Sequence, residues 1–208
     1  IYDTVRSPRG KGKKGSLNEL SAVTLSAKIL KELRERNSLN TEEIEDVIWG
    51  NVTQVGEQGG CLARSAVIAA NYSESTPGLS INRFCASGLE AVNLATNQVK
   101  GSAGNAYVAG GVEMMSRVPM GSDGAAIAVD PTLAMNSYFV PQGISADILA
   151  TKYGFSRDDV DAFAVESQKR ASAARQSGHF KKSIAPIKDQ NNLTILDEDE
   201  YIRPETSM

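Results

Sequence analysis

The residue with the clearest chemical potential in this sequence is Cys85. It follows a predicted strand over residues 79–84 and precedes a predicted helix over residues 87–100. A thiol in this position lies beside unpaired main-chain N–H groups and the positive end of a helix dipole, and both stabilise a thiolate. The same N–H groups can hold the oxyanion that forms when a nucleophile attacks a carbonyl. The setting predicts a cysteine nucleophile, and a buried cysteine that only fills the core is the alternative.

The other residues of catalytic type are few. Cys61 also precedes a predicted helix, over about residues 62–70, and we interpret it as a small, buried core residue. With two cysteines and one histidine in the sequence, neither a disulfide framework nor a metal site is predicted. His179 follows the end of a predicted helix, and we expect it at the surface.

The first part of the chain alternates between two periodicities. Apolar positions three and four residues apart indicate helices, and short apolar runs bounded by Gly or Pro indicate strands. The predicted strands cover residues 1–5, 46–52, 79–84 and 105–109, and the helices cover residues 18–36, 62–70 and 87–100. Strands that alternate with helices predict an α/β fold, with a mainly parallel sheet covered by helices.

The pattern changes after residue 118, so we place a domain boundary there, between residues 1–118 and 119–208. Residues 120–142 are rich in small residues and show no regular period. Helices are predicted over residues 145–153 and 156–177, the second with a capping box at its start and Gly178 after its end. The second segment therefore looks like an insertion on the α/β core.

Two charged segments are interpreted as solvated loops. Residues 6–15 form a basic, Gly-rich loop without the spacing of a Walker phosphate-binding motif, so we favour a connector over a phosphate site. Residues 198–200 form an acidic run. The formal net charge of −3 gives no overall attraction to nucleic acid, and no apolar run is long enough to span a membrane. The few cysteines favour a reducing, cytoplasmic location, with the mitochondrial or peroxisomal matrix as the alternative.

Three segments resemble the thiolase family. Residues 81–91 (INRFCASGLEA) resemble its acyl-enzyme signature, and residues 110–116 (GGVEMMS) its Gly-Gly-x-Glu-x-Met-Ser segment. Residues 143–147 (GISAD) resemble its Gly-x-Thr-Ala-Glu segment, although Pro141-Gln142 stands where many thiolases have His-Met. The resemblance implies that Cys85 takes an acyl group from an acyl-CoA.

The resemblance also implies a fold and an assembly. Two similar α/β halves would form a five-layered α-β-α-β-α body, with residues 1–118 in the N-terminal half and 119–208 in part of an inserted loop domain that helps to bind CoA. Two copies would join through sheet edges as a homodimer. We expect the helix at residues 87–100 to be covered, because apolar residues surround much of it: Leu89, Ala91, Val92, Leu94, Ala95 and Val99.

The implied activity is acyl transfer between CoA thioesters in fatty acid metabolism, by cleavage of a 3-ketoacyl-CoA or by condensation. CoA is a substrate, and no further cofactor or cofactor-binding residue is predicted. The family's Gly-His-Pro, Asn-Glu-Ala-Phe and Cys-x-Gly-Gly-Gly segments do not occur in this chain, so we expect the chain alone to be inactive and its C-terminal half to lie elsewhere. The alternatives are a ketoacyl-synthase-like condensing enzyme and a non-catalytic CoA-binding or interaction fragment.

Overall fold

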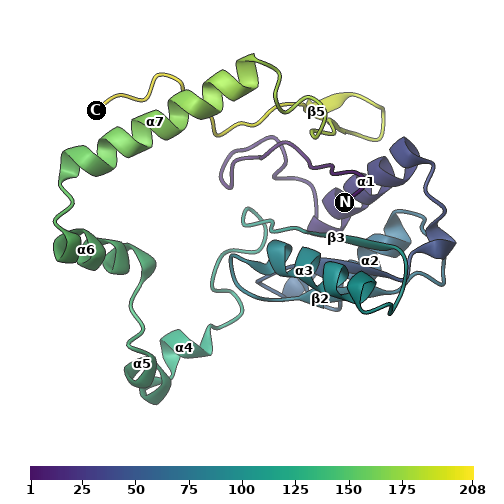
Figure 1. Ribbon diagram of the computed structural model, residues 1–208, viewed down its shortest axis with the longest axis horizontal. Coiled ribbons are helices and arrows are strands. Elements are labelled where there is room, and N and C mark those ends of the chain that lie inside the picture. Colours follow the sequence, from purple (N-terminus) through teal and green to yellow (C-terminus); the bar gives the residue numbers. More distant parts are fainter. The chain divides into compact units, whose positions relative to one another are not determined.

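The computed structural model describes residues 1–208, and its α/β core is built on a three-stranded parallel sheet (Figure 1). The strands are β1 (Asp46–Gly50), β2 (Gly78–Ile81) and β3 (Tyr107–Gly111), and they lie in the order β2-β1-β3. In the register of the sheet, Val47 of β1 lies opposite both Gly78 and Val108. The α/β class expected from the sequence is confirmed.

Alternate side chains of the central strand β1 face two different layers of helices. Val47 and Trp49 are buried in the core that contains α1 (Ala22–Asn37) and α2 (Leu62–Ala69). Ile48 points to the other face, where it packs against Ala91 and Ala95 of α3 (Ser87–Lys100). This alternation follows from the two-residue period of a strand. One strand thus fixes α3 on one side of the sheet and α1 with α2 on the other.

The remaining elements are short, or lie outside the sheet. They are the 3-10 helices η1 (Thr41–Glu43) and η2 (Gly56–Gln58), the helices α4 (Ala126–Val129), α5 (Pro131–Ser137), α6 (Gln142–Tyr153) and α7 (Arg157–Gln176), and the strands β4 (Ile187–Lys188) and β5 (Thr194–Leu196). The strands β4 and β5 pair in antiparallel fashion. None of the helices is both long enough and apolar enough to cross a membrane.

The strand predicted at residues 1–5 is wrong. Of the first residues only Arg6 makes a β-bridge, opposite Ile184. The Arg6 N–H donates to the Ser183 carbonyl and the Arg6 carbonyl accepts from the Ala185 N–H, both at 2.8 Å. Ile1 is 99% exposed, so the first residues have no neighbouring strand against which to form a ladder.

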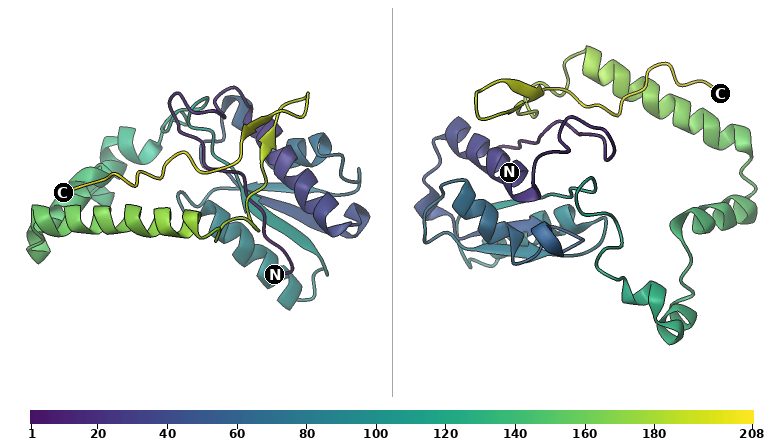
Figure 2. Two further views of the ribbon diagram at one scale, coloured as in Figure 1. Left: turned by 90° about the horizontal axis from the view of Figure 1, so that it is seen from above. Right: turned by 180° about the vertical axis from the view of Figure 1, so that it is seen from behind.

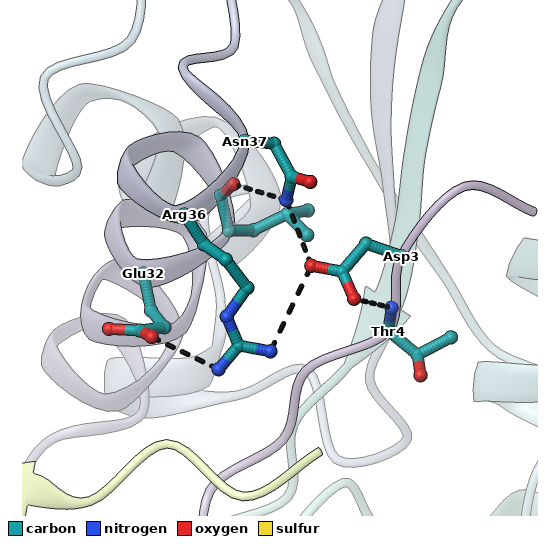
Figure 3. Close-up of polar contacts among 6 residues, drawn as sticks. Asp3, Thr4, Glu32, Arg36 and Asn37 are labelled. Atoms are coloured by element: carbon teal, nitrogen blue, oxygen red, sulfur yellow. Dashed lines mark hydrogen bonds and ion pairs between the residues drawn. The ribbon is translucent and has the colours of Figure 1, made fainter. Parts of the chain in front are cut away.

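Asp3 instead ties the N-terminal segment to the end of α1 (Figure 3). Its carboxylate accepts a hydrogen bond of 2.9 Å from the side-chain amide of Asn37 and lies 3.8 Å from the guanidinium of Arg36. Its other oxygen accepts from the N–H of Thr4. The hydrogen bond from Asn37, followed by that from Thr4, lowers the pKa of Asp3.

The acidic run at residues 198–200 is not merely solvated, which corrects the sequence interpretation. Asp199 is buried and accepts two hydrogen bonds from the Arg6 guanidinium, of 2.7 and 2.9 Å. Glu200 accepts from the N–H groups of Lys11 and Ser16 and from the Ser16 hydroxyl. These two carboxylates hold the basic loop of residues 6–15, so that loop is a fixed part of the fold.

The chain divides into two compact units. The first contains residues 1–123 and 183–200, and the second contains residues 124–182 and 201–208. The second unit includes α7, which Figure 2 shows as one continuous helix and which begins with the predicted capping box between Ser156 and Asp159. Whether the domains of the whole protein divide between residues 118 and 119 stays a prediction.

Candidate active site

Cys85 lies in the turn that connects β2 to α3, at the carboxyl end of the parallel sheet. The strand ends at Ile81 and the helix begins at Ser87, and the thiol between them is exposed. Ligand sites of open α/β sheets form at the carboxyl ends of their strands. The alternative that Cys85 only fills the core therefore does not hold.

The turn has an unusual backbone, which side chains from both of its ends stabilise. Phe84, directly before the cysteine, has a φ of 47°, in the left-handed region that a residue with a Cβ rarely adopts. The Asn82 side chain accepts a hydrogen bond of 2.8 Å from the Phe84 N–H. The Ser87 hydroxyl accepts one of 2.9 Å from the Arg83 N–H and donates one of 2.6 Å to the Phe84 carbonyl.

These hydrogen bonds leave the main-chain N–H of Cys85 unused. The N–H groups of Ala86 and Ser87 donate to the carbonyls of Arg83 and Phe84, at 3.1 and 3.0 Å. The Cys85 N–H, in contrast, has no acceptor among the hydrogen bonds of the turn. An exposed thiol next to an unused N–H is the arrangement that can attack a carbonyl and then hold its oxyanion.

Gly50, the last residue of β1, allows the start of α3 to approach the sheet this closely. A Cβ at position 50 would lie 2.5 Å from the carbonyl carbon of Ser87 and 2.6 Å from the N of Gly88. Distances under 3 Å between a Cβ and main-chain atoms do not occur without a shift of one of them. Position 50 therefore needs glycine because of the helix that it contacts.

The structure places Cys61 differently from the sequence interpretation. It is exposed, not buried, and it is the N-cap residue of α2, with a φ of 58°. Its thiol donates to the carbonyl of Gly78 across 3.2 Å, and the Ser80 hydroxyl donates to its sulfur across 3.9 Å. The prediction failed because Cys61 lies in a left-handed turn before α2, beside the edge strand β2, where its thiol stays exposed.

The other segments singled out in the sequence belong to different elements of the chain. Residues 110–116 continue from β3 and so reach the same sheet end as Cys85. Residues 143–147 lie in α6, whose side chains Ile144, Ile148 and Thr151 line a shallow hollow of about 380 Å³. His179 is exposed, as predicted, with its ring edge-on to Phe180. No group of three or more His, Cys, Asp or Glu side chains is placed to hold a metal ion.

Sequence reasoning missed the residues that shape the turn. Asn82 could have been found, because an Asn two residues before a strained position is typical of an Asx turn. Gly50 and the Ser87 hydroxyl could not, since their roles depend on contacts between elements that only the fold brings together.

Comparison with known proteins decides the family. The family described as "Thiolase, N-terminal domain" matches residues 1–208. The chain belongs to the thiolase family. Among curated relatives, it is 40% identical to a 3-ketoacyl-CoA thiolase of Shewanella sp. (strain MR-7) and 37% identical to one of Colwellia psychrerythraea. A 3-ketoacyl-CoA thiolase of Acinetobacter baylyi is 36% identical.

The match to each of these thiolases covers the whole chain but only part of the relative. All of this chain aligns in each case, with 54% of the relative. The chain therefore spans about half the length of the curated thiolases it matches. The fold expected for a thiolase N-terminal portion is confirmed.

Proposed function

We propose that the whole protein transfers an acyl group between CoA thioesters through an acyl-Cys85 intermediate. The observation that supports this most strongly is the exposed Cys85 thiol in a strained turn that leaves its own N–H unused. Membership of the thiolase family, and the name 3-ketoacyl-CoA thiolase of its relatives, support the substrate class.

The first step is acylation of the cysteine. The Cys85 thiolate attacks the thioester carbon of an acyl-CoA, the carbonyl oxygen becomes an oxyanion beside the Cys85 N–H, and the CoA thiolate leaves. In the cleavage direction the thiolate attacks instead the 3-keto carbon of a 3-ketoacyl-CoA. The bond between carbons 2 and 3 then breaks, and the carbanion of acetyl-CoA leaves and takes up a proton. The dipole of α3 supports the negative charge at this end of the helix.

The second step releases the acyl group to another thioester. The sulfur of a CoA attacks the acyl-cysteine in the cleavage direction, and the carbanion of a second acyl-CoA attacks it in the condensing direction. In both directions the bond from the acyl carbon to Cys85 breaks and the Cys85 thiolate leaves. Each step needs an acid or base near the reacting atoms. The family's Gly-His-Pro segment and its second cysteine, which this chain lacks, would supply these groups from the other half of the protein.

The outer face of α3 offers apolar surface that another part of the protein would cover. Leu89 and Val99 of this helix are 65% and 47% exposed, while Val92 is half-buried. We assign that cover to the other half of the protein.

The proposed assembly and setting follow from the family. A homodimer would join through the edge strand β2, and the loop domain around α6 would contribute to CoA binding. The protein would act in fatty acid metabolism in the cytoplasm.

The test is turnover by the full-length protein. We expect CoA-dependent cleavage of a 3-ketoacyl-CoA that is abolished by Cys85→Ala and retained by the matched Cys61→Ala variant. Decarboxylation of a malonyl thioester without 3-ketoacyl-CoA cleavage would instead favour the ketoacyl-synthase alternative. Absence of both activities, with CoA still bound, would favour the non-catalytic alternative.

A further inference from the structure

Glu113 holds the loop that follows β1. Its carboxylate accepts a hydrogen bond of 2.8 Å from the Val52 N–H and one of 3.4 Å from the Thr53 N–H. It also accepts one of 2.8 Å from the side-chain amide of Gln58. Because β1 ends at Gly50, these two main-chain N–H groups lie beyond the sheet ladder, and Glu113 supplies the acceptors that the sheet does not.

The same loop is bonded to the turn that contains Cys85. The Val52 carbonyl accepts a hydrogen bond of 3.2 Å from the side-chain amide of Asn82. The other end of that amide accepts from the Phe84 N–H at 2.8 Å, directly before the cysteine. One Asn side chain therefore joins the loop that Glu113 holds to the strained residue of the turn.

We propose that Glu113 is a positioning residue for Cys85, which acts through the Val52 peptide and the Asn82 side chain. The Glu113 carboxylate fixes the Val52 peptide, this peptide orients Asn82, and Asn82 keeps Phe84 at its positive φ. In this way Glu113 sets the direction of the Cys85 N–H without touching the substrate. The inference rests on the proposed acyl transfer, since positioning matters only where an oxyanion must be held.

A purely structural role is the competing explanation, because Glu113 also connects β3 to the loop through Gln58. The Gln58 side chain accepts from the Met114 N–H and donates to the Thr53 carbonyl, independently of the turn. Removal of Glu113 could therefore loosen this region without a specific effect on Cys85. The two roles differ in which reactions of Cys85 they affect.

Three variants of the full-length protein separate these roles. Glu113→Gln keeps the shape of the side chain but leaves one acceptor oxygen for three donors. Asn82→Ser keeps a short acceptor for the Phe84 N–H but cannot also reach the Val52 carbonyl. The matched control is Glu57→Gln, next to Gln58 in η2, because Glu57 pairs with Arg117 and takes no part in the connection to Asn82.

The measurement compares two reactions of the same thiol. Single-turnover acylation by acetyl-CoA forms an oxyanion that needs the aligned N–H. Alkylation by iodoacetamide forms no oxyanion and reports only the thiolate fraction, which the dipole of α3 still supports in the variants. Cys61 in the same chain reports general loosening. For Glu113→Gln we expect about a tenfold or larger loss in acylation rate and at most about a twofold change in alkylation of either cysteine. Asn82→Ser should lose a similar factor, and the double variant should lose little more than the worse single variant. Glu57→Gln should acylate like the unsubstituted protein.

Each other result overturns the inference. Unchanged acylation in Glu113→Gln, an equal loss in Glu57→Gln, or additive losses in the double variant would remove the connection between Glu113 and the turn. Parallel changes in the alkylation of Cys85 and Cys61 would show loosening instead of positioning. If acetyl-CoA does not acylate Cys85 even in the unsubstituted protein, both the proposed function and this inference are wrong. If it acylates Cys85 in the unsubstituted protein and equally fast in the variants, only this inference is wrong.

Discussion

Replacement of Gly50 by alanine should displace the start of α3 and with it the Cys85 turn. The added Cβ would lie 2.5 Å from the carbonyl carbon of Ser87 and 2.7 Å from its oxygen. Ordinary contacts between carbon atoms lie at about 3.5–4.0 Å, so the two backbones would have to separate by roughly 1 Å. Gly50 belongs to the central strand of the sheet and Ser87 to the helix packed on it, so neither backbone can move as a flexible side chain would.

The expected cost follows from that displacement. Overpacking of a well-packed region costs about 1–3 kcal/mol in the free energy of unfolding. A shift of about 1 Å at a catalytic group can lower a rate by about 100-fold. We therefore expect Gly50→Ala to lower both the stability and the rate of Cys85 acylation, with the larger effect on the rate.

Denaturant unfolding and single-turnover acylation of the full-length protein measure the two effects. Gly88→Ala is the control for stability, because a Cβ at position 88 meets no atom within 4 Å and alanine favours a helix over glycine. Its unfolding midpoint should stay the same or rise. If Gly50→Ala unfolds at the same denaturant concentration as the unsubstituted protein and acylates as fast, the close approach of β1 and α3 does not position Cys85.

Three further predictions concern Asp199, the relative reactivity of the two cysteines, and the activity of the chain alone. Asp199→Asn should lower the free energy of unfolding by about 1–3 kcal/mol at neutral pH, whereas the exposed Asp197→Asn should change it by less than about 0.5 kcal/mol, as measured by urea titration. The hydrogen bonds from Arg6 lower the pKa of Asp199 in the folded protein, so Asp199 should stabilise the fold above the ordinary carboxyl pKa range. This stabilisation should be lost as the pH falls through the lowered pKa. An effect of Asp199→Asn on the free energy of unfolding that is equal at all pH values would contradict this. Iodoacetamide should label Cys85 faster than Cys61, whose thiol must first give up its bond to a carbonyl, and peptide mapping that shows equal labelling would refute this. The 208-residue chain alone should show no 3-ketoacyl-CoA cleavage, and robust Cys85-dependent turnover would contradict the need for acid and base groups from outside residues 1–208.

Local sequence signals predicted which elements surround the site, although the strand predicted at residues 79–84 covers Gly78–Ile81 and the turn of Cys85 begins earlier than expected. The helix at residues 87–100 has the predicted bounds, because its apolar periodicity and the strand-turn signal before it coincide. The capping box at Ser156 marked the start of α7 within one residue. The strand predicted at residues 46–52 is shorter, because the main chain after Gly50 leaves the sheet to bond Glu113.

Contacts between distant residues account for most errors. Arg6 and Asp199 are 193 residues apart in sequence, and no local pattern shows that an acidic run will neutralise a basic loop at the other end of the chain. The helix α5 was missed although Asp130-Pro131 is a start signal, with the Asp130 side chain accepting from the Leu133 N–H. The strands β4 and β5, of 2 and 3 residues, are too short for a period to show.

The most direct test of the account is the identity of the atom that receives the acyl group. The full-length protein is mixed with acetyl-CoA, quenched in acid within one turnover, digested and analysed by mass spectrometry. We predict an acetyl group on the peptide that contains Cys85, absent in Cys85→Ala, unaffected by Cys61→Ala, and removed when free CoA is added before the quench. Acetyl transfer to another residue, or turnover that persists in Cys85→Ala, would contradict the central claim that Cys85 is the nucleophile.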